Sequence, residues 1–153
     1  MSKRKISYAG KINMGTQDKI NLKTNNGKTG YKITKFQVIS TTPGATASVE
    51  YVAKIFNKDQ TGSIGAVVDF TDSNLLACAF YQVRSDASVA NAETIIFDNK
   101  EFNQDIFITI EDAEGGTVPC NYYLELEQVR LDLSENTVAT LKDIRNIESG
   151  KYV

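Results

Sequence analysis

The segment Cys120-Asn121-Tyr122-Tyr123-Leu124-Glu125-Leu126-Glu127 decides the fold class of this chain. From Tyr122 onward, apolar residues at even positions alternate with mostly charged residues at odd positions. Successive side chains of a β-strand point to opposite faces, so this period of two is typical of a strand with one buried face. The segment predicts an all-β protein.

Similar patterns recur on the N-terminal side of this segment. We predict further strands over 31–40, 49–55, 65–70, 94–97 and 106–110. Turn signals such as Thr41-Thr42-Pro43-Gly44 separate them. Short strands at this spacing predict an antiparallel two-sheet β-sandwich, jelly-roll-like or similar, over residues 31–133.

Residues 72–84 fit two patterns. Asp72 or Ser73 can cap a helix with apolar residues on one side, whereas a period of two fits equally well. The β-rich surroundings favour a strand from Leu76 to Val83.

The two ends of the chain differ from this middle part. Residues 1–30 are polar and rich in Gly and Asn, and we expect a basic, extended N-terminal arm with at most one edge strand. Residues 134–153 predict a C-terminal helix and tail, because Ser134 can cap a helix whose apolar stripe contains Val138, Leu141 and Ile144. That stripe covers the chain's own sheet or packs against the same helix of another subunit.

Charge is divided unevenly along the chain. The first 35 residues hold nine Lys or Arg against Asp18 alone, a net of +8, whereas the remaining 118 carry a net of −10. Such a division favours contact between the arm of one copy and the body of the next, and we predict that Lys3, Arg4, Lys5 and Lys11 dock on another subunit. Deletion of residues 1–12 is then expected to leave the domain folded.

Other roles for the basic arm are less favoured by its composition. It can serve solubility alone. Nucleic acid is not expected as the partner, because the arm has few arginines and its tyrosines are not interleaved with the charges.

Composition excludes several kinds of chemistry. The chain has no His, which removes imidazole-based triads and zinc sites. It also lacks the GxGxxG, GxxxxGK[ST], GxSxG and HExxH motifs. We therefore expect no enzyme, no catalytic residue, no cofactor and no metal.

Three weaker alternatives stay open. Asp69 with Asp72, or the acidic turn Glu111–Glu114, can be read as paired catalytic carboxylates or as Ca²⁺ ligands. A carbohydrate-binding module would need an aromatic strip, to which at most one of Tyr122 and Tyr123 contributes, since they point to opposite faces.

Neither the cysteines nor the N-terminus indicates secretion. Cys78 and Cys120 lie outside any CxxC motif, and we expect two reduced thiols, with a disulfide as the alternative. No signal peptide or membrane-spanning run of about 20 apolar residues is expected.

Several strings resemble those of small virion-associated proteins of marine tailed bacteriophages, and the likeness runs from about Lys19 onward. The strings are Tyr31–Phe36, Glu93–Asn99, Phe102–Thr109, Cys120–Glu127 and Thr140–Arg145. The resemblance implies a β-sandwich that coats or joins a virion, is made in the host cytoplasm and assembles as many symmetric copies. Its partners would be other virion proteins, the major capsid or tail subunits.

We accordingly expect a non-enzymatic auxiliary capsid or decoration protein that forms homo-oligomers. A tail or receptor-binding and glycan-binding adhesion module is the first alternative. A jelly-roll coat subunit is the second.

Overall fold

The computed structural model describes residues 4–43, 48–62, 64–84, 89–97 and 100–131. These residues form eight strands and contain no helix. In chain order the strands are β1 (Lys5–Ile12), β2 (Thr16–Ile20), β3 (Thr29–Ser40), β4 (Val49–Phe56), β5 (Leu75–Arg84), β6 (Val89–Ile96), β7 (Ile106–Asp112) and β8 (Cys120–Arg130).

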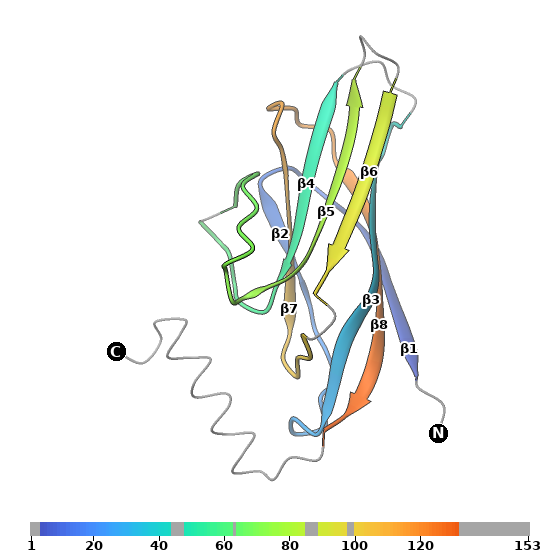
Figure 1. Ribbon diagram of the computed structural model, residues 1–153, viewed down its shortest axis with the longest axis vertical. Coiled ribbons are helices and arrows are strands. Elements are labelled where there is room, and N and C mark those ends of the chain that lie inside the picture. Colours follow the sequence, from blue (N-terminus) through green and yellow to red (C-terminus); the bar gives the residue numbers. More distant parts are fainter. Residues whose placement is uncertain (1–3, 44–47, 63, 85–88, 98–99, 132–153) are drawn as a thin grey trace.

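The strands form two antiparallel sheets that face one another (Figure 1). One sheet has three strands in the order β1-β8-β3, and the other has five in the order β2-β7-β4-β5-β6. Buried residues of both sheets belong to one hydrophobic core. The all-β prediction is therefore confirmed, and a sandwich is consistent with this arrangement.

The alternation predicted from the sequence determines which side chains enter the core. Ile106, Ile108 and Ile110 of β7 are fully buried, and so are Leu124 and Leu126 of β8. On the same strand Tyr122 is 7% exposed and Tyr123 is 37% exposed, so this pair does point to opposite faces. The choice of a strand for residues 72–84 is also confirmed, because β5 spans Leu75–Arg84.

The prediction of an extended arm over residues 1–30 is wrong for the part of that range that the structure describes. β1 pairs with β8 along its whole length, and β2 pairs with β7. Ile12 and Ile20 are buried in the core, so the N-terminal segment is part of both sheets. Deletion of residues 1–12 would remove an entire strand, which overturns the expectation that the remaining domain is unaffected.

Gly10 of β1 shows how closely the N-terminal strand fits. A Cβ atom at Gly10 would lie 2.8 Å from the hydroxyl oxygen of Tyr122, so only glycine leaves room for that ring. The Tyr122 hydroxyl in turn donates a hydrogen bond of 3.4 Å to Asp18 Oδ2 on β2, and burial is the main reason that its pKa is raised to about 12.

The predicted strand over 65–70 is not formed. The described residues between β4 and β5, 57–62 and 64–74, instead form a loop, which we call the 57–74 loop. It is drawn in green in Figure 1 beside β2 and β4. Lys54, on the outward side of β4, is 7% exposed, and its Nζ donates to the carbonyl oxygen of Val67 at 2.7 Å. β4 is therefore buried on both faces, where one buried face was predicted.

The predicted helix over residues 134–153 lies outside the described residues. So does Lys3.

Lys54→Met tests the hydrogen bond between Lys54 of β4 and the carbonyl oxygen of Val67 in the loop. The methionine side chain matches lysine as far as Cε but lacks the Nζ donor. Because burial lowers the pKa of Lys54, the charged amine carries a desolvation penalty that offsets part of its hydrogen bond. We expect the free energy of unfolding to change by no more than about 1 kcal/mol, whereas proteolysis within residues 57–74 should become faster.

The exposed variant Lys28→Met is the matched control. Wild type should also gain stability relative to Lys54→Met as the pH rises through the lowered pKa of folded Lys54 toward 10.5, since the unfolded state then binds more protons. Unchanged loop proteolysis in Lys54→Met would show that the bond does not hold the loop.

Candidate subunit-contact surface

Of the predicted basic contact residues, Arg4 and Lys5 contact β8 of the same chain. Lys5 lies on β1, and its Nζ is 3.7 Å from Glu125 Oε2 on β8. The carbonyl oxygen of Arg4 accepts a hydrogen bond of 2.8 Å from the Gln128 amide. Lys11 is exposed on β1, opposite Asn121. Val138, Leu141 and Ile144 lie outside the described residues.

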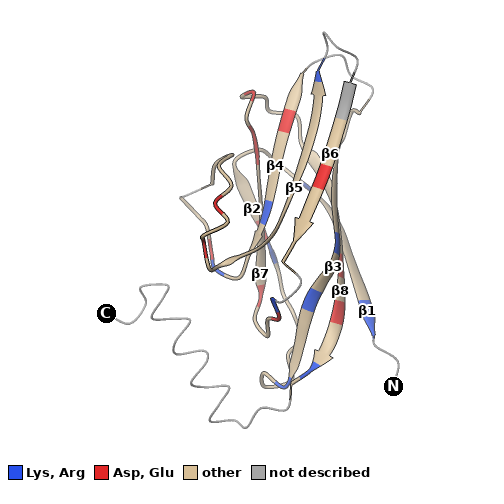
Figure 2. Cartoon of the chain, viewed as in Figure 1, with Lys and Arg blue, Asp and Glu red and all other residues tan. Residues whose placement is uncertain are grey.

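Glu125 and Glu127 lie on a strand flanked by two lysine-bearing strands. Lys32 Nζ of β3 is 3.9 Å from Glu127 Oε2, and these side chains are 34% and 12% exposed. A further ion pair of 3.6 Å joins Lys19 to Asp105. Each ion pair named here therefore connects the basic first 35 residues with the acidic part of the same chain (Figure 2).

A bulge between Ile33 and Lys35 shifts the register of β3 against β8. Thr34, the residue left out of register, donates its hydroxyl to Glu125 at 3.0 Å. Lys35 then places its Nζ 5.9 Å from the centre of the Tyr123 ring. Exposed ion pairs contribute only about 0.2–1 kcal/mol each, so these contacts add little to the free energy of unfolding.

The acidic residues considered as catalytic pairs or calcium ligands organise turns. Asp69 Oδ1 accepts from the amide and hydroxyl of Thr71, and Asp72 Oδ1 accepts from the amide of Asn74. Asp112, which is 3% exposed, accepts from the amides of Glu50 and Glu114. Among the described residues, no three His, Cys, Asp or Glu side chains are grouped so that they could hold a metal ion.

Both cysteines are free and buried, as expected for reduced thiols. Burial is the main cause of the raised pKa of each thiol, and the pKa of Cys120 reaches about 12.

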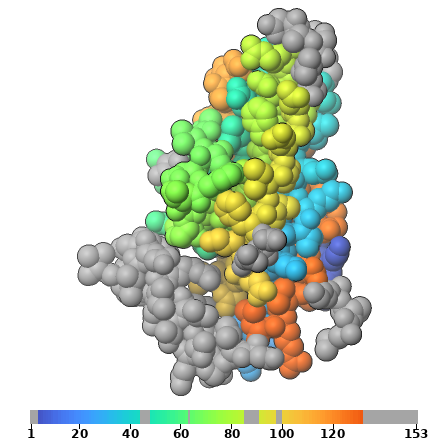
Figure 3. Space-filling view, in the orientation of Figure 1, coloured from blue at the N-terminus to red at the C-terminus, as the bar shows by residue number. Residues whose placement is uncertain are grey.

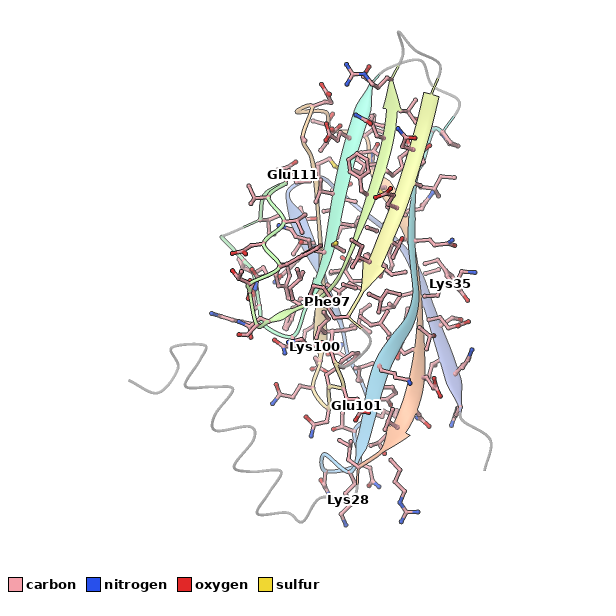
Figure 4. The ribbon with its side chains drawn as sticks, viewed as in Figure 1. Lys28, Lys35, Phe97, Lys100, Glu101 and Glu111 are labelled. Carbon is pink, nitrogen blue, oxygen red and sulfur yellow. The ribbon has the colours of Figure 1, made fainter. Side chains whose placement is uncertain are left out.

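An exposed apolar cluster on the five-stranded sheet was not predicted. We call it the apolar patch. It consists of the exposed side chains of Val67, Val68, Phe70 and Ile95, together with the partly buried Phe97. Val67 is 79% exposed and Phe70 is 54% exposed. The ring centroids of Phe70 and Phe97 are 5.4 Å apart, edge to face, and this contact joins the 57–74 loop to the residue that follows β6. Phe97 is labelled in Figure 4.

Two lysine hydrogen bonds and two turns hold the loop side of the apolar patch in place. The amine of Lys54 fixes the carbonyl of Val67, and Lys100 Nζ donates to the carbonyl of Ser73 at 3.3 Å. The turns made by Asp69 and Asp72 shape the chain between them. A fixed, exposed apolar surface is suited to contact with another protein.

A groove of about 600 Å³ opens on the other side of β6, between β6 and β3. The small side chains of Ala79 and Ala92 face Val38 and Tyr122 across it, which leaves the space. Ile39 lines the groove and is 47% exposed. Figure 3 shows β6 in yellow next to β3 in cyan, with the 57–74 loop in green.

Comparison with protein-family models, with curated proteins and with solved structures found no match. Within the described part of the chain, no helix is long and apolar enough to cross a membrane. Exposed apolar side chains lie on one side of β6 and the groove lies on the other. Asp69 and Asp72 are hydrogen-bonded within their own turns.

Charge reversal at Lys32 and Glu127 tests whether the strands recognise one another by charge. Lys32→Glu and Glu127→Lys should each lower the free energy of unfolding in urea, whereas the double variant should recover about 0.5–1 kcal/mol of the summed loss. Lys28→Glu, at an exposed turn position, is the control. Strictly additive losses would mean that the pair has no coupling.

Thiol labelling tests the burial of both cysteines. At about pH 8 the native protein should not react with an aromatic disulfide reagent, because neither raised pKa leaves an appreciable fraction of thiolate. Two thiols should react at once in denaturant. Rapid reaction of one thiol in the native protein would contradict this burial.

Proposed function

We propose that this chain is a non-enzymatic structural protein of a bacteriophage virion, an auxiliary capsid or decoration protein that acts by binding its neighbours. The observation that carries the proposal is the exposed apolar patch on a rigid two-sheet body. Apolar surface of this kind is costly to leave in water and gains stability when a neighbour covers it.

Repetition makes such a contact effective. A protein present in many symmetric copies multiplies a modest interaction into stable attachment. The resemblance of five segments to virion-associated phage proteins supports this setting, in which the partners are major capsid or tail subunits and further copies of the chain. The jelly-roll-like connectivity and the C-terminal helix with Val138, Leu141 and Ile144 belong to the same proposal.

A glycan-binding adhesion module is the second candidate, favoured by one observation. Tyr123 is 37% exposed at the groove, together with Gln37, Asn121 and Glu93. Aromatic rings and amide or carboxylate groups are the side chains that bind sugars. Saturable binding on a glycan array, lost in Tyr123→Ala, would favour this candidate.

Particle incorporation tests the main proposal. Purified virions of the encoding phage should contain the wild-type chain in many copies. Phe70→Asp with Val67→Asp should lower that copy number at least tenfold, because two charges replace apolar contact area of the patch. Circular dichroism confirms that the variant is folded.

Lys28→Glu is again the matched surface control. Full incorporation of the double Asp variant would exclude the apolar patch as the contact. Absence of the wild-type chain from the particle would end the proposal itself.

A further inference from the structure

We infer that β6 pairs with β6 of a second copy of this chain, antiparallel across a two-fold axis, in the register that places Ala92 opposite Ala92. This inference rests on the proposed function, because it identifies a second copy as the partner beside the apolar patch. The five-stranded sheets of two copies would join into one continuous sheet.

The four sheet edges of the described chain differ in their protection against pairing. Lysines occupy three of them: Lys5 and Lys11 on β1, Lys32 and Lys35 on β3, and Lys19 on β2, which has only five residues. Lysine and shortness are the usual means by which proteins block an edge strand.

β6 has none of these protections. Its eight residues, Val-Ala-Asn-Ala-Glu-Thr-Ile-Ile, include no Lys, Arg or Pro. Asn91 to Ile95 are all exposed. β6 is therefore the one unprotected edge among those that the structure describes, and an unprotected edge favours strand addition.

Hydrogen bonding determines which positions of β6 face the partner. The Phe97 amide donates to Leu76 of β5, and antiparallel strands use alternate residues for such bonds. Odd-numbered positions thus bond to β5, and Ala92 and Thr94 direct their backbone N–H and C=O groups to the free edge. The ladder between the copies would use these even-numbered positions.

Charge then selects the register. Centring the pair on Glu93 would place two carboxylates directly opposite each other, which is unfavourable across strands. Centring the pair on Asn91, the third residue of β6, leaves fewer residues of the two strands opposite one another. Centring it on Ala92 places Glu93 opposite Asn91 and keeps the longest overlap without a like-charge pair.

The neighbouring surfaces agree with a partner at this edge. The groove beside β6 exposes Ile39, and Ile95 of the apolar patch is 43% exposed on the opposite face of the sheet. A two-fold axis perpendicular to the sheet brings both grooves together on one side and both apolar patches together on the other. A second copy would therefore shield apolar side chains on both sides of the paired strands.

Cysteine cross-linking of the full chain tests the register. Residues opposite one another in a hydrogen-bonded antiparallel pair have Cα atoms about 5.5 Å apart, which suits a disulfide. Oxidation of Ala92→Cys with diamide should give a covalent dimer, whereas Glu93→Cys and Lys28→Cys, at an exposed turn away from β6, should give none. The native Cys78 and Cys120 are buried and should contribute no background.

Ala92→Lys gives an independent test without oxidant. Two lysines at the axis should shift sedimentation from dimer toward monomer, while circular dichroism stays unchanged. Cross-linking through Glu93→Cys or Lys28→Cys in place of Ala92→Cys would overturn the inference, as would a monomeric wild type at every concentration. If either of these results is found while the wild-type chain is present in purified virions, only the inferred β6 pairing is overturned. If the wild-type chain is absent from the virions, the proposed function is overturned.

Discussion

The fold depends on one hydrophobic core shared by both sheets, and one placement of charge accompanies it: an acidic strand, β8, lies between two lysine-bearing strands, β1 and β3. Glu125 meets Lys5 on one side, and Glu127 meets Lys32 on the other. Each ion pair is weak alone, yet the pattern penalises pairings that would bring lysine strands together. The basic N-terminal part is thereby held against the acidic remainder of its own chain, and the core forms beneath it.

Much of the fold follows from the period of two in the sequence. Ile106, Ile108 and Ile110 enter the core as their spacing predicts, and β8 presents Leu124 inward and Glu125 outward. Local alternation predicts such strands because each has one solvent-exposed face and one buried face. The period of two does not predict the 57–74 loop. Its apolar residues predict a strand over 65–70, but in the structure they cover the outward face of β4, which is therefore buried on both faces.

The N-terminal error has a different physical cause. Lys5–Ile12 alternates as a strand does, but Gly10 and the two lysines made it look solvated. Position 10 requires glycine because a larger side chain would clash with the ring of Tyr122, which is more than 100 residues away in sequence. The apolar patch escaped notice for the same reason, since Phe70 and Phe97 meet only in the folded chain. Contacts between distant segments leave no local signal.

The exposed binding surfaces lie around β6, which contains no Lys or Arg and takes part in none of the ion pairs named above. Lysine disfavours pairing at the edges formed by β1, β2 and β3, whereas β6, the apolar patch and the groove are open. The proposed assembly would form through these open surfaces. All of this requires that Lys5–Ile12 be a strand in solution. Amide hydrogen exchange measured by NMR tests it directly: amides of β1 that face β8 should exchange with the slow rates of the core strands. Exchange of these amides at the rate of an unfolded peptide would contradict the account.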